Sequence, residues 1–122
     1  SLERTEVPVK EITVEDPFMQ KLVELITENA QDPELSMEVL YNKLGMSRTQ
    51  FFRKIKAISD LSPNKLILNI RMKMAVEKFQ SGGMTIAEVA YEVGFSDPAY
   101  FSKVFKSVFN QTPTEYIKNI GK

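Results

Sequence analysis

Residues 85–109, TIAEVAYEVGFSDPAYFSKVFKSVF, decide the fold of this chain. The first half opens on a capping threonine, continues with apolar residues at helical spacing and stops at Gly94. Asp97-Pro98 then begins a second helix, because aspartate is a good N-cap and proline fits the first helical position. The stretch therefore predicts two helices joined by a tight turn. The side chains expected to face inward are Ile86, Val89, Ala90 and Val93 in the first helix and Phe101, Val104, Phe105, Val108 and Phe109 in the second.

The same pattern occurs earlier in the chain, over residues 36–59. Ser36 and Ser47 are the expected caps, and Gly45 holds the place of Gly94. Two copies in one chain are far more specific than a lone helical corner, so we interpret them as an internal duplication. The apolar positions agree if the second copy has a turn longer by one residue: Met37, Leu40 and Leu44 match Ile86, Val89 and Val93, and Phe51, Ile55 and Ile58 match Phe101, Phe105 and Val108.

The rest of the chain predicts three further helices and no convincing strand. Each begins with a capping side chain followed by proline, an arrangement common at helix starts. These pairs are Asp16-Pro17, Ser62-Pro63 and Thr112-Pro113. We therefore expect an all-α domain of seven helices, in which a long linker helix joins two helix-turn-helix units. The expected bounds are 16–122 for the domain, about 36–59 for the first unit, about 63–80 for the linker helix and about 85–109 for the second unit, with residues 1–15 as a linker or an arm from a larger protein.

Composition excludes several kinds of chemistry. The chain has no cysteine and no histidine, so disulfides and thiolates are excluded, and the commonest metal ligand and general base are missing. Its carboxylates are scattered, with no partner base and no glycine-rich loop for phosphate. No apolar run approaches the length of a membrane span, and no signal-peptide pattern opens the chain. We therefore expect no enzyme, no catalytic residue, no metal or other cofactor, no membrane contact by this segment, and a cytoplasmic setting.

Charge is distributed unevenly although the net charge is zero. Residues 1–42 hold 3 Lys or Arg and 10 Asp or Glu, whereas residues 43–78 hold 9 and 2, respectively. Residues 79–122 hold four of each kind. Such asymmetry indicates either a surface that binds a polyanion or an ordinary solvated helix surface.

A helix-turn-helix unit suits DNA for a steric reason. A helix about 10–12 Å across fits a major groove about 12 Å wide when a second helix braces it from outside. The linker helix expected at 63–80 would be roughly 27 Å long at about 1.5 Å per residue. That length suits two units that enter successive major-groove turns, about 34 Å apart. The sequence thus predicts sequence-specific binding of double-stranded DNA through the second helix of each unit, which we term the reading helix.

Residues 85–118, TIAEVAYEVGFSDPAYFSKVFKSVFNQTPTEYIK, resemble the signature of the DNA-binding domain of AraC/XylS-type transcriptional regulators. The resemblance covers about residues 17–120 and implies a seven-helix domain with two helix-turn-helix units that binds DNA and controls transcription. Residues 33–75, PELSMEVLYNKLGMSRTQFFRKIKAISDLSPNKLILNIRMKMA, are similar to the C-terminal output domain of hybrid two-component regulators, in which a sensor and a kinase precede this domain. The elements that carry the first resemblance are Ile86, Ala90, Gly94-Phe95-Ser96, Tyr100-Phe101, Phe105-Lys106, Thr112-Pro113 and Tyr116.

The first reading helix offers most of the candidate base contacts. Arg53 suits a bidentate contact to guanine, and Thr49 and Gln50 suit base edges or methyl groups. Phe52 either packs on a thymine methyl or belongs to the core. The resemblance places the family's base-reading positions on Thr49, Phe52 and Arg53. The full set of candidates on this helix is Arg48, Thr49, Gln50, Phe52, Arg53 and Lys56.

The second reading helix offers small or flexible side chains, namely Ala99, Ser102, Lys103 and Lys106. They suit phosphate contacts and close backbone approach better than base recognition. The resemblance maps the family's second reading helix onto Pro98, Ala99 and Lys103, and Pro98 has no backbone N–H to donate. We therefore expect the first unit to discriminate between DNA sequences more than the second does.

The alternative function is a helical protein-protein interaction module without DNA binding. Such a module should expose apolar anchor residues where this chain has Arg48-Thr49-Gln50 and Arg53. The two functions are compatible, because the acidic segment 1–38 could contact RNA polymerase or a sister domain while 43–106 lies on DNA.

Overall fold

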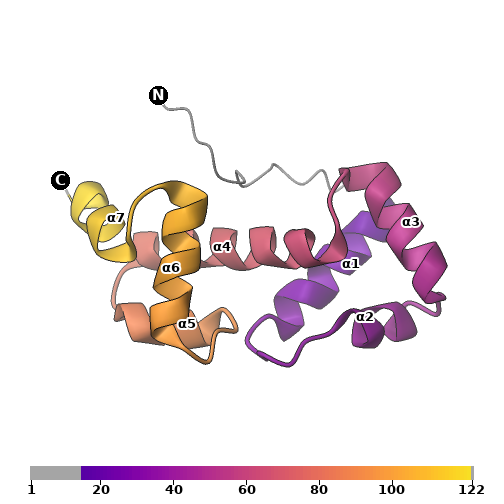
Figure 1. The fold of residues 1–122 in the computed structure, drawn as a ribbon, viewed down its shortest axis with the longest axis horizontal. Coiled ribbons are helices and arrows are strands. Elements are labelled where there is room, and N and C mark those ends of the chain that lie inside the picture. The colour runs from indigo at the N-terminus through magenta and orange to yellow at the C-terminus, as the bar shows by residue number, and fades with distance from the viewer. Residues whose placement is uncertain (1–14, 122) are drawn as a thin grey trace.

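The computed structural model describes residues 15–121, and within them it contains seven helices and no strand (Figure 1). The all-α prediction is therefore confirmed for the described part of the chain. Most of the arm expected at residues 1–15 lies outside the described residues. The helices are α1 (Pro17–Asn29), α2 (Met37–Lys43), α3 (Arg48–Ser59), α4 (Pro63–Ser81), α5 (Ile86–Glu92), α6 (Pro98–Phe109) and α7 (Pro113–Ile120).

Each helix begins directly after the capping residue from which the sequence predicts its start. The Asp16 carboxylate accepts hydrogen bonds from the N–H groups of Phe18 and Met19, at 2.8 and 3.2 Å. Such caps satisfy backbone donors that have no partner inside the helix. The other N-caps are Ser36, Ser47, Ser62, Thr85, Asp97 and Thr112.

Two separate apolar cores lie along α4, which bridges α1–α3 and α5–α7 (Figure 1). Leu66, Ile67 and Ile70 complete the first core, and Met72, Ala75 and Phe79 complete the second. At about 100° of rotation per residue, these two groups face roughly opposite sides of α4. The helix is therefore buried on one side over its first half and on the other side over its second half.

Ile58 does not belong to the first core, contrary to the periodicity of its helix. Its side chain is 37% exposed, whereas Phe51 and Ile55 on the same stripe are fully buried. Helix length does not explain the difference, because α2 and α3 have the same lengths as α5 and α6, 7 and 12 residues, and the matching Val108 of α6 is buried. In the second unit α7 packs against α6, a contact that has no equally extensive counterpart between α4 and α3. Leu61, just beyond the helix, is buried in that core instead.

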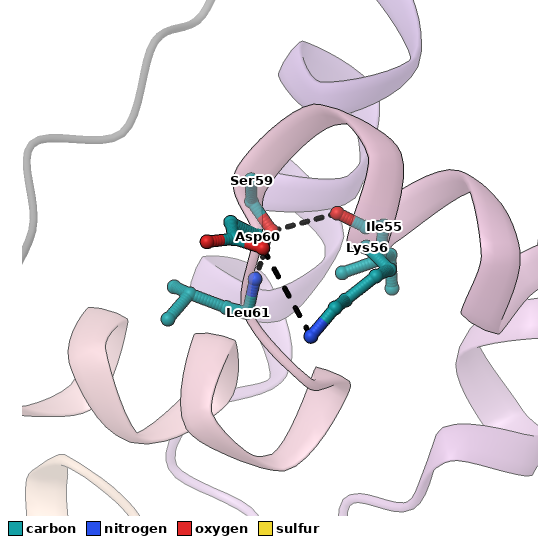
Figure 2. A network of polar contacts seen from close by, with 5 residues as sticks. All are labelled: Ile55, Lys56, Ser59, Asp60 and Leu61. Atoms are coloured by element: carbon teal, nitrogen blue, oxygen red, sulfur yellow. Dashed lines mark hydrogen bonds and ion pairs between the residues drawn. The ribbon is translucent and has the colours of Figure 1, made fainter.

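The end of α3 turns the chain sharply into α4 (Figure 2). Asp60 adopts the left-handed conformation with φ 60°, and the Ser59 hydroxyl donates to the Ile55 carbonyl at 2.8 Å. The same hydroxyl accepts from the Leu61 N–H at 3.1 Å. These bonds occupy backbone groups that the helix end leaves free.

Candidate nucleic-acid interface

The two helix-turn-helix turns have the same backbone geometry. In the first, Gly45 has φ 67° and the Met46 N–H donates to the Tyr41 carbonyl at 2.9 Å. In the second, Gly94 has φ 96° and the Phe95 N–H donates to the Ala90 carbonyl, also at 2.9 Å. Both are Schellman-type helix ends, in which a left-handed residue closes a 6→1 hydrogen bond. The duplication read from the sequence is thus present in the turns themselves.

The reading helices α3 and α6 also end alike. Asn110 follows α6 with φ 61°, as Asp60 follows α3 with φ 60°. Both then lead into a helix that begins with a buried proline, Pro63 or Pro113. The two reading helices therefore end in the same local structure, whereas their N-caps differ, because only the N-cap of α3 belongs to a capping box. Figure 1 shows α3 and α6 near opposite ends of α4, each lying across its direction.

The outer face of α3 is polar and cationic. Five of its six candidate residues are exposed, and Phe52 is half-buried. Lys54 adds a further exposed cation on this helix. Cations crowded on one protruding helix give a local positive field that attracts phosphates. The exposed candidates are Arg48, Thr49, Gln50, Arg53 and Lys56.

Phe52 is both the edge of the core and a support for an arginine. Its ring packs against the first core and meets the Phe51 ring edge-on, with the centroids 5.9 Å apart. The Arg48 guanidinium carbon lies over the outer face of the Phe52 ring, 4.3 Å from its centroid. A guanidinium stacked on an aromatic ring loses fewer conformations when it binds a ligand. Phe52 therefore orients Arg48 at the start of the reading helix.

Gln50 has a structural partner that the sequence interpretation missed. Its side-chain oxygen accepts from the Ser47 N–H at 3.0 Å, and the Ser47 hydroxyl accepts from the Gln50 N–H at 3.2 Å. This reciprocal pair is a capping box, and the Ser-x-x-Gln spacing could have identified it. The cap therefore engages the side-chain oxygen of Gln50 but not its amide N–H groups.

Lys56, at the other end of the same face, forms an exposed ion pair. Its Nζ lies 3.9 Å from an Asp60 carboxylate oxygen (Figure 2). A solvated pair of this kind contributes little to stability. It does, however, place one negative charge beside a candidate phosphate ligand.

The second reading helix presents a smaller and less varied surface. Ala99, Lys103 and Lys106 are exposed, whereas Pro98 and Ser102 are half-buried. An open hollow of about 500 Å³ runs beside α6 to the start of α7. Lysines with short polar neighbours around a shallow hollow suit a phosphodiester backbone better than a base edge. The hollow is lined by Ser102, Lys103, Lys106, Ser107, Asn110 and Thr112.

Glu115 forms a capping box with Thr112, one of the residues that line this hollow. The Thr112 N–H donates to its carboxylate at 2.8 Å, and this bond is the main reason that the pKa of Glu115 lies below its ordinary value. The charge of Lys106 lowers the pKa further, whereas desolvation opposes the shift. The carboxylate caps α7, which explains an acid beside an otherwise cationic surface.

Residues 15–121 contain neither a cluster of metal ligands nor a membrane-spanning helix. No group of three or more carboxylates is arranged there to hold a metal ion. None of the described helices has the length and apolar character needed to cross a bilayer.

Comparison with known proteins points to the same kind of domain. Residues 40–119 match the family of helix-turn-helix domains. Histidine kinase P4 of Formosa agariphila is 34% identical over 104 residues, which are 85% of this chain but 8% of that protein. The Msm operon regulatory protein of Streptococcus mutans is 32% identical over 98 residues, or 80% of this chain and 35% of that protein. The chain therefore spans only a small part of these curated relatives.

A solved structure resembles nearly the whole described fold. It is the C-terminal domain of AraT, a response regulator from Geobacillus stearothermophilus, which superposes with a TM-score of 0.78 at 28% identity. The match covers 85% of this chain and 86% of that one. Both the helix arrangement and the sequence therefore agree with this neighbour.

Proposed function

Because this chain belongs to the AraC-type helix-turn-helix family of transcriptional regulators, we propose that residues 16–122 bind specific double-stranded DNA sequences and thereby regulate transcription. The reading helices α3 and α6 enter two successive major grooves on one face of the duplex. The observation that carries this proposal is the pair of turns with matching backbone geometry, one in each of the two units that α4 joins. With 19 residues, α4 is about 28 Å long, which suits a groove-to-groove distance of about 34 Å.

The two reading helices contact different parts of the DNA. On α3, Arg53 and Thr49 contact base edges, and Arg48 reaches a guanine or a phosphate from its support on Phe52. On α6, Lys103 and Lys106 contact phosphates around the hollow beside α7. The alternative of an interaction module would need apolar anchors on α3, where the candidate positions carry exposed polar and cationic side chains instead.

The domain acts as the output part of a larger, signal-responsive cytoplasmic protein and has no enzymatic role of its own. The long relatives support this context, since one of them is a histidine kinase of which the match spans 8%. The acidic surface of α1 and the loop after it, with Glu24, Glu28, Asp32 and Glu34 exposed, is available to RNA polymerase or a sister domain.

Selection of bound sites from random duplex DNA, carried out at two salt concentrations, tests the proposal. We expect a bipartite motif whose halves are centred about 10 base pairs apart, and affinity that falls steeply as salt rises. A double variant, Arg53→Ala with Lys103→Ala, serves as the control because both side chains are exposed and their loss should spare the fold. Recovery of no enriched motif, or equal binding by the control, would show that the domain does not recognise DNA in this way.

A further inference from the structure

Arg71 reaches from the middle of α4 to the loop that follows α1. Its Nη2 donates a hydrogen bond to the Asp32 carbonyl at 2.8 Å, across 39 positions of sequence. This bond connects the linker helix α4 to the loop after α1, at a point away from the axis of α4.

Gly94, in the turn of the second unit, packs at the same place. A Cβ at Gly94 would collide with the Ala30 carbonyl oxygen and would lie 2.7 Å from Arg71 Nη2. Figure 1 shows the loop after α1 and the turn between α5 and α6 lying side by side near the middle of the molecule. The end of α1, the middle of α4 and the second turn therefore meet at one junction, made of Ala30, Asp32, Arg71 and Gly94.

The Arg71 guanidinium is partly withdrawn from water at this junction. Burial lowers the pKa of Arg71, although the Asp32 carboxylate partly opposes the shift. Its Nε is buried and has no hydrogen-bond partner among residues 15–121. The hydrogen bond to the Asp32 carbonyl is itself exposed, so its strength comes from the charge on the donor.

The junction can restrict the relative rotation of the two units because the two cores are made of different buried residues. The buried residues of the two cores come from different halves of α4, and only the partly buried Met74 packs against both, so twisting or bending of that helix would rotate one reading helix relative to the other. A contact away from the helix axis that joins the loop after α1 to the second unit's turn resists such rotation.

We propose that Arg71, packed against Gly94, is a positioning residue that fixes the angle between the two reading helices and thereby sets the spacing of DNA half-sites that the domain accepts. The second part of this inference rests on the proposed function, whereas the first part concerns the free protein. Inserting one base pair between half-sites moves one of them by about 3.4 Å and rotates it by about 35°, which a rigid pair of units cannot follow.

A distance measurement without DNA tests the first part. The chain contains no cysteine, so cysteines introduced at the exposed Ala57 on α3 and Ser107 on α6 would be the only sites for spin labels. We expect one narrow distance distribution in the parent and a clearly broader one in Arg71→Met, which keeps an apolar stem but loses the donor. Lys73→Met, at an exposed position of the same helix, is the matched control and should keep the narrow distribution.

Binding to DNA of altered spacing tests the second part. The probes are the selected operator and versions with one base pair added or removed between its halves. We expect the parent to lose about tenfold or more in affinity on either change, as it would for a lost base-pair contact, and Arg71→Met to lose less than about threefold. Arg71→Lys should restore part of the discrimination, because a lysine can still donate to the Asp32 carbonyl.

Each outcome decides the inference. If Arg71→Met is folded and retains the narrow distribution or the parental spacing preference, Arg71 does not position the reading helices. If Arg71→Met fails to fold, Arg71→Gln, whose side chain is shorter and uncharged, takes its place, and an unchanged distance distribution in that variant is the overturning result. Failure of the site selection would overturn the proposed function alone, since the label distances are measured without DNA.

Discussion

Gly45 and Gly94 occupy equivalent positions in the two turns, yet only Gly94 is closed in by the rest of the protein. Both have positive φ, 67° and 96°. A Cβ on Gly45 would meet nothing within 4 Å, whereas one on Gly94 would strike the Ala30 carbonyl and the Arg71 guanidinium. Gly45 is therefore needed only for the backbone conformation of its turn. Gly94 is needed both for the conformation of its turn and for close packing against the rest of the protein.

Substitution of each glycine by alanine should distinguish the cost of backbone strain alone from the cost of strain together with a collision. Gly45→Ala places an L-residue at positive φ in open space and should lower the free energy of unfolding by about 1–2 kcal/mol. Gly94→Ala adds a collision with backbone and should cost about 2–5 kcal/mol in total. Urea denaturation of both variants measures the difference. Equal losses would contradict the close packing at Gly94.

Arg53→Ala and Lys103→Ala should have different effects on DNA binding. The first should cost about 1–3 kcal/mol on the matched operator and relax the preference at one base pair. The second should weaken binding to matched and mismatched sites alike and reduce the salt slope by about 1. Titrations on both kinds of site at several salt concentrations distinguish them. The reverse pattern would reject the division of roles between α3 and α6.

Gln50→Ala should affect stability more than sequence preference. Loss of the capping box should lower the free energy of unfolding by about 0.5–2 kcal/mol, while the selected motif stays the same. Gln50→Glu is the matched control, since it keeps the cap acceptor and should recover stability while its charge weakens DNA binding. A changed base preference in Gln50→Ala would instead make Gln50 a direct base contact.

Asp60→Asn should strengthen DNA binding. The change removes a carboxylate 3.9 Å from Lys56 and leaves a residue type that already occupies the left-handed position at Asn110. It also removes a negative charge from the C-terminal end of α3, where the helix dipole disfavours it. We expect higher affinity and a salt slope steeper by up to about 1, with stability unchanged or slightly raised. Lower affinity would show that the ion pair positions Lys56 productively.

Glu115 should make stability sensitive to mild acid. Because its folded-state pKa lies below the ordinary 4.5, its contribution is complete above that value and is lost as pH falls through the folded pKa. Glu115→Gln keeps an acceptor for the Thr112 N–H without titrating, so its free energy of unfolding should fall less steeply over the same range. Denaturation curves at a series of acidic pH values make the comparison; parallel curves would contradict the assignment.

The helix boundaries could be predicted because their causes are local. A cap such as Asp97, a following proline and a left-handed stop such as Asn110 act within one or two turns of helix. Periodicity also placed most of the core correctly. It failed at Ile58 because burial depends on whether another element reaches that turn, which the sequence of α3 alone does not encode.

The junction at Arg71 could not be predicted from the sequence for the same reason. Its partner lies 39 residues away, and the contact exists only once α1 and the second turn are packed together. As one of nine Lys or Arg in residues 43–78, Arg71 had no feature that marked it as different. The support of Arg48 by Phe52 likewise needed coordinates, since the sequence left the role of that ring undecided between core and DNA.

The two cores also shape how recognition can evolve. Since α3 and α6 rest on different sets of buried side chains, substitutions on one should leave the packing of the other untouched, and their effects on binding free energy should add. Such additivity would allow single substitutions to change the sequence preference for one half-site during evolution while the preference for the other half-site stays the same.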